Sequence, residues 1–108
     1  MNILEIQSKL PWGREYSASF QANPCVYKDF QHALTHISKA SGKLWTIVEE
    51  ADHIGDTPAF CFKKEDIEKF LADLVICAMR MANTNPSGLI NLQKAVINRL
   101  EMKNGVKL

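Results

Sequence analysis

The sequence predicts an all-α protein, and three observations support this fold class. Apolar residues recur at spacings of three and four over two long stretches, residues 26–53 and 63–83. No stretch alternates apolar and polar residues over the length of a strand between turn residues. Glycine and proline mark breaks near residues 11–13, 54–62 and 85–88, which divide the chain into pieces of helical length.

The composition is that of one globular domain. The 108 residues are 46% apolar and 23% charged, a balance that is neither disordered nor fibrous. We therefore expect a single domain over residues 1–108, with an irregular N-terminal segment at 1–22 and three main helices in a core at 24–104. A chain of this length buries only about two-thirds of its unfolded surface. Long apolar helices in so small a domain predict a homo-oligomer, either a dimer or a tetramer.

The charges disfavour a generic nucleic-acid or membrane-surface protein. The formal net charge is +1, which supplies no broad cationic surface. Eight of the 12 carboxylates fall between Glu49 and Asp73, so the charge is unevenly spread along the chain. No run reaches the roughly 18 apolar residues of a membrane span.

The cysteines and the N-terminus indicate a cytoplasmic protein. The three cysteines are odd in number and form no CxxC pair, which argues against a disulfide framework. The first residues lack a cationic segment followed by an apolar run, so we expect no signal peptide.

In chain order, residues 1–22 form the least regular segment. Leu4, Ile6 and Leu10 are its candidate anchors before Pro11 and Gly13 break any helix. Trp12, between these two breakers, is either a satellite core residue or an aromatic lid over a ligand.

A long helix is predicted over residues 26–53, after Asn23-Pro24 as an N-cap and first-turn proline. Its apolar positions repeat at three and four and predict one buried stripe, made of Phe30, Leu34, Ile37, Ser41, Leu44 and Val48. Gly42 within this helix costs about 1 kcal/mol relative to alanine, so it indicates close packing or a bend.

A second helix is predicted over residues 63–83 and a third from Asn91 to Asn104. The expected core side of the second helix consists of Ile67, Phe70, Leu71, Leu74, Ala78 and Met81. Asn91 is positioned to cap the third helix, which carries Leu92, Ala95, Val96 and Leu100. Asn104-Gly105 is a typical helix end.

Asp73 is a candidate catalytic or ligand-binding residue, because it lies in the otherwise mostly apolar run 70–81. An unpaired buried carboxylate is unfavourable by several kcal/mol or takes up a proton. Lys69 lies one turn before it and Arg80 two turns after it. Two interpretations remain open: an ion pair that satisfies a buried charge, or membership of a metal or substrate site.

A polar line on the first long helix is a second candidate site. Its members share spacings of four, three, four and seven, and they are His32, His36, Lys39, Lys43 and Glu50. The line is either a solvated face or a cationic wall that binds phosphate or another anion. The two histidines also have the i, i+4 spacing of metal ligands, with His53 and Cys61 as further candidate ligands, although no HExxH or CxxC motif accompanies them.

Two blocks carry a family resemblance. Residues 39–44, Lys-Ala-Ser-Gly-Lys-Leu, correspond to an E-E-x-x-E block with its Gly-x-Leu step, and residues 70–73, Phe-Leu-Ala-Asp, to an E-x-x-D block that opens an apolar helix. With its last helix, the chain from about Asp29 to Asn104 resembles the MazG-like all-α nucleoside triphosphate pyrophosphohydrolases. The resemblance implies a MazG-like helical bundle, oligomeric assembly and a nucleotide ligand.

The resemblance also implies a lost metal site. The positions that hold magnesium-binding glutamates in the family are occupied here by Lys39, Ala40, Lys43 and Phe70, and only Asp73 remains. Magnesium needs oxygen ligands, and ammonium groups in their place repel it. We therefore expect no efficient hydrolysis by the family's usual magnesium-dependent route, and Mg²⁺ as a cofactor only if the metal site is displaced.

The resulting hypothesis is a MazG-like protein that binds a nucleotide or another small anionic ligand. Its ligand-binding residues would be His32, His36, Lys39, Lys43, Asp73 and Trp12. One alternative is an active, Mg²⁺-dependent pyrophosphohydrolase whose metal site is displaced to Glu49, Glu50, Asp52 and Asp73, since residues 49–53 imitate the acidic block. The other is a structural oligomer or partner-binding module.

Overall fold

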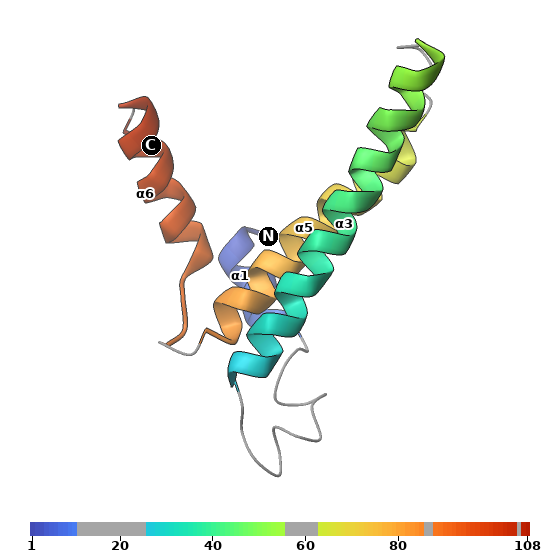
Figure 1. Ribbon diagram of the computed structural model, residues 1–108. Helices are drawn as coiled ribbons and strands as arrows, with labels where there is room; N and C mark the ends of the chain where they lie inside the picture. The colour runs from blue at the N-terminus through green and yellow to red at the C-terminus, as the bar shows by residue number, and fades with distance from the viewer. Residues whose placement is uncertain (11–25, 56–62, 86–87, 106) are drawn as a thin grey trace. The chain divides into compact units, whose positions relative to one another are not determined.

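The described part of the chain is entirely helical. The structure is a computed structural model that describes residues 1–10, 26–55, 63–85, 88–105 and 107–108. Its helices are α1 (Ile3–Lys9), α3 (Val26–Ile54), α5 (Lys64–Asn83) and α6 (Leu92–Asn104), as Figure 1 shows. No strand occurs in these ranges, so the all-α prediction is confirmed. None of the described helices is long and apolar enough to cross a membrane.

The chain divides into two compact units, which we describe separately. Residues 1–31 and 79–108 form the first unit, and residues 32–78 form the second. The helix bounds agree with the predicted long helices to within one residue, at 26–54 and 64–83. The predicted cap at Asn23-Pro24 lies outside the described residues.

Helix α1 corrects the prediction of an irregular N-terminus, at least up to residue 10. Asn2 caps it, because the Asn2 side chain accepts a hydrogen bond from the Glu5 N–H at 2.9 Å. The expected anchors Leu4 and Ile6 are exposed, whereas Gln7 is buried with only 3% of its surface accessible. A polar residue is therefore the most buried part of α1.

In the first unit, α1 and α6 complete each other's first turns. The first N–H groups of a helix have no partner within the helix. The Leu4 N–H of α1 donates to Gln93 Oε1 at 3.3 Å, and the Leu92 N–H of α6 donates to Gln7 Oε1 at 3.2 Å. Two glutamines thus cap two helices reciprocally.

The ends of α6 match the prediction. The Asn91 side chain accepts from the Lys94 N–H at 3.1 Å. At the other end Gly105 has φ of 64°, a left-handed conformation that favours glycine, and its N–H donates to the Glu101 carbonyl at 2.9 Å. Both ends of α6 are therefore fixed by local residues that the sequence displays.

The second unit is an antiparallel helical pair made by residues 32–54 of α3 and 64–78 of α5 (Figure 1). The buried residues on α3 are Ala33, Ala40 and Ile47, spaced by seven. This heptad spacing is typical of a seam between two packed helices. On α5, Cys77 is buried.

This seam corrects the predicted buried stripe. Leu34 and Val48 of α3 and Leu71 of α5 were expected in the core, yet they are 42–50% exposed. At about 100° per residue, Leu34 lies roughly one residue around the helix from the seam. Alanines at the seam allow close helix packing, and the larger side chains lie on a flank that nothing within the described unit covers.

Candidate functional site

The predicted cationic line lies on the surface of α3. His32, His36, Lys39 and Lys43 are all exposed, along one flank of the Ala33–Ala40–Ile47 seam. Leu34 and Val48 lie on the other flank. The helix therefore separates a polar, partly cationic side from an apolar side.

Two lysines from the two helices approach one aromatic ring. Lys43 Nζ of α3 lies 5.3 Å from the centroid of the Phe70 ring on α5, and Lys69 Nζ lies 5.9 Å from it. We call these three residues the Phe70 cluster. Each contact contributes on the order of 0.5–1 kcal/mol at an exposed site. The contact also brings residues 39–44 beside residues 70–73, the two blocks that carry the family resemblance.

Asp73 is less buried than the sequence indicates. Its side chain is only partly buried on α5, one turn after Lys69. Within the described residues the ion pairs are Glu49–His53 and Lys64–Glu68, so Asp73 forms none with Lys69. The expectation of a fully buried carboxylate is therefore wrong, and the intrahelical pair with Lys69 is not formed. An ion pair with a second subunit and membership of a binding site both stay predictions.

His32 and His36 contact each other. Their Nε2 atoms are 3.1 Å apart, and their ring centroids are 4.6 Å apart with the planes at 68°. In a neutral imidazole one ring nitrogen donates and the other accepts. The distance therefore corresponds to a hydrogen bond from the Nε2–H of one ring to the Nε2 of the other.

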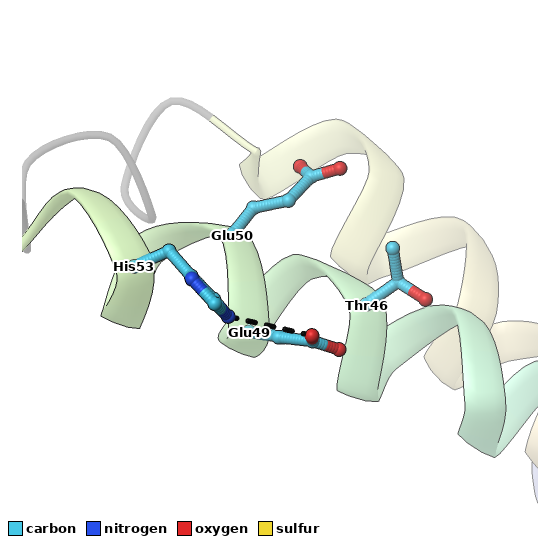
Figure 2. Close-up of a pocket in the computed structure, with 4 residues that line it drawn as sticks. All are labelled: Thr46, Glu49, Glu50 and His53. Carbon is cyan, nitrogen blue, oxygen red and sulfur yellow. Dashed lines mark ion pairs between the residues drawn. The ribbon is translucent and has the colours of Figure 1, made fainter.

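The acidic end of α3 borders a surface hollow of about 450 Å³ lined by Thr46, Glu49, Glu50 and His53 (Figure 2). Glu49 Oε1 and His53 Nε2 are 3.4 Å apart, and both side chains are more than 70% exposed. Figure 2 shows Glu50 extending away from this pair. An exposed i, i+4 ion pair adds little stability. Because Glu50 extends away from Glu49 and His53, the three side chains do not converge on one ligand position in the hollow.

The displaced metal ligands are not brought together. In the parts of the chain that are described, no three His, Cys, Asp or Glu side chains lie close enough to hold a metal ion. The contact between Lys43 and Phe70 shows that these two residues lie at the same level of the antiparallel helices. At 1.5 Å per residue, Glu50 and Asp73 then lie on the order of 15 Å apart along the helix axes.

Two predicted site residues, Trp12 and Cys61, lie outside the described residues. Conversely, Phe70 and Lys69 form a cluster with Lys43 that sequence reasoning did not identify. The sequence pattern identifies Phe70 as a core residue and as a replaced family glutamate, and not as a partner of lysines. The register of α3 against α5 is needed to see the cluster, and that register depends on the tertiary structure.

A scan against protein-family models and searches among curated proteins and solved structures found no match to this chain. In its described residues the structure defines an all-helical protein, whose second unit has a partly cationic flank and an exposed apolar flank. The MazG-like resemblance stays an expectation.

Proposed function

We propose that this protein binds a small phosphate-bearing anion, such as a nucleotide, without hydrolysing it. The Phe70 cluster carries this proposal. Two ammonium groups from different helices lie within 6 Å of one ring centroid, where their charges repel each other. A phosphate that contacts both ammonium groups relieves this repulsion and accepts charge-assisted hydrogen bonds.

Neighbouring groups extend the cluster into a binding surface. Lys39 and His36 lie on the same flank of α3 as Lys43 and add a positive charge and a hydrogen-bonding imidazole. Asp73 follows Lys69 by one turn on α5, and among the described residues it belongs to no group of side chains that could hold a metal ion. The proposed ligand is therefore bound by cations of the protein instead of by Mg²⁺.

Calorimetry with inorganic pyrophosphate and with ATP, in the absence of metal, tests this proposal. Lys43→Gln and Lys69→Gln are each expected to weaken binding by about tenfold, the value of one charge-assisted hydrogen bond. The matched control is Lys64→Gln, which removes an exposed lysine that pairs with Glu68 on the same helix. Rising salt should weaken binding, because exposed charges are screened.

Turnover is measured in parallel, by phosphate or pyrophosphate release with Mg²⁺ or Mn²⁺. The expected result is little or no release by the wild type, and loss of binding in Lys39→Glu/Lys43→Glu. Robust metal-dependent turnover would support the displaced-metal enzyme instead. If the wild type binds no anion, the remaining hypothesis is a structural oligomer or partner-binding module.

The structural module is a second candidate, favoured by the apolar flank of the second unit. We define this apolar face by its exposed large residues, Leu34, Trp45, Val48, Leu71 and Val75. Trp45 is 72% exposed and, with Ser41, Leu44 and Val48, lines a hollow of about 240 Å³. Because α3 and α5 are antiparallel, their exposed apolar residues lie on the same side of the pair.

The occupant that fits this face is a second copy of the chain. Contiguous apolar patches of this kind mark interaction sites. In a two-fold symmetric dimer the same patch supplies both sides of the interface, so this one apolar face is sufficient for a dimer of the chain.

A further inference from the structure

The paired imidazoles of His32 and His36 have a geometry that anion binding does not require. Their Nε2 atoms are 3.1 Å apart on one turn of α3, and both side chains are exposed to solvent. Residues four apart on a helix have Cβ atoms about 5–6 Å apart, so the backbone of α3 keeps the two rings within reach of one ligand.

This separation suits two ligand atoms on one metal ion. Two nitrogens bound to zinc at about 2.0–2.1 Å stand about 3.4 Å apart at a tetrahedral angle and about 2.9 Å apart at a right angle. The observed 3.1 Å lies between these values. We infer that His32 and His36 chelate a divalent transition-metal ion such as Zn²⁺, Ni²⁺ or Cu²⁺, with water in the remaining positions.

The chemistry of the ligands selects the class of metal. Imidazole nitrogen binds Zn²⁺, Ni²⁺ and Cu²⁺ well, whereas Mg²⁺ prefers oxygen ligands. Without metal, one Nε2–H donates to the other Nε2. On chelation the donor ring changes to its Nδ1–H tautomer, so both Nε2 lone pairs bind the ion and no proton is lost from the pair.

The third histidine of the chain is a built-in comparison. His53 is exposed like the other two, but its Nε2 lies 3.4 Å from a carboxylate oxygen of Glu49. It follows His36 by 17 positions on the same helix. At 1.5 Å per residue that is on the order of 25 Å, too far to supply a third ligand.

Lys39 provides an electrostatic check. It lies one turn after His36 on the same flank, where its ammonium group repels a bound cation. Replacing it with the neutral Lys39→Gln should tighten metal binding. The same substitution should weaken phosphate binding at the Phe70 cluster, so the two sites respond with opposite signs.

Calorimetry with ZnCl₂, NiCl₂, CuCl₂ and MgCl₂ on the whole chain tests the inference. We expect one transition-metal ion per chain and no heat with Mg²⁺. Because the second imidazole binds intramolecularly, His32→Gln and His36→Gln should each weaken binding by about tenfold or more, while His53→Gln stays within about twofold of wild type. Circular dichroism verifies that the exposed substitutions leave the helices intact.

Thermal unfolding gives a second readout, since a ligand that binds only the folded helix raises Tm. Zn²⁺ should raise the Tm of wild type and His53→Gln, and it should leave the Tm of His36→Gln unchanged. The inference is overturned if no transition metal binds the wild type. It is equally overturned if His53→Gln loses as much affinity as His36→Gln.

Discussion

Gln7 of α1 and Asn83 of α5 hold each other through two hydrogen bonds of opposite direction. Gln7 Nε2 donates to Asn83 Oδ1 at 2.9 Å, and Asn83 Nδ2 donates to the Gln7 carbonyl at 3.1 Å. Gln7 Nε2 also donates to the Ile90 carbonyl at 2.7 Å. With the Leu92 N–H on its Oε1, the Gln7 amide joins α1 to the end of α5 and the start of α6.

Gln7→Met should destabilise the protein by about 2–4 kcal/mol, because it keeps the side-chain length and leaves Asn83 Oδ1, the Ile90 carbonyl and the Leu92 N–H without their partner. The measurement is urea unfolding monitored by circular dichroism. Ser8→Ala is the matched control, since the Ser8 hydroxyl donates to the Glu5 carbonyl within its own helix. A loss below about 1 kcal/mol for Gln7→Met would contradict the proposed role of the amide.

Helix ends were predictable where the signal is local. Asn91 and Gly105 lie next to the helix that they terminate, and the structure confirms both. Helix α1 was missed because its cap is the second residue of the chain and its seven residues are too few for periodicity to show. The burial of Gln7 depends on partners 76 to 85 residues away, which no local pattern reveals.

The sequence predicted the bounds of α3 better than it predicted which face of α3 is buried. Ala33 and Ala40 form the seam, but small side chains contribute little to a hydrophobic pattern. Leu34 and Val48 dominate the pattern and lie on the uncovered flank. For the candidate site, the exposed cationic line follows from spacing, whereas the contact of Lys43 with Phe70 requires the register between two helices.

Gly105→Ala should destabilise the protein by about 1 kcal/mol, since an L-residue is disfavoured in the left-handed region by roughly that amount. Nothing lies within 4 Å of a Cβ built at Gly105, so backbone strain is the sole expected cause. The check is the unfolding free energy from urea titration. An unchanged unfolding free energy would contradict this prediction. It would mean that residue 105 can leave the conformation with φ of 64° without a loss of stability.

Gly42→Ala should have the opposite sign and stabilise the protein by up to about 1 kcal/mol, the difference in helix propensity between the two residues. Gly42 lies inside the continuous helix α3, and a Cβ there meets no atom within 4 Å. The close packing that the sequence suggested is therefore not seen around Gly42 in the described chain. Destabilisation, measured by the same unfolding titration, would place a second chain against Gly42.

The apolar face should make the protein self-associate at micromolar concentration. Sedimentation velocity is expected to show at least a dimer for the wild type and a monomer for Trp45→Glu, because a charge at the centre of an apolar interface must be desolvated without a partner. Leu89→Glu is the matched control: Leu89 is 77% exposed, similar to Trp45, but it belongs to the other unit. A monomeric wild type, or a Leu89→Glu variant that dissociates as Trp45→Glu does, would remove the argument that this face binds a second copy.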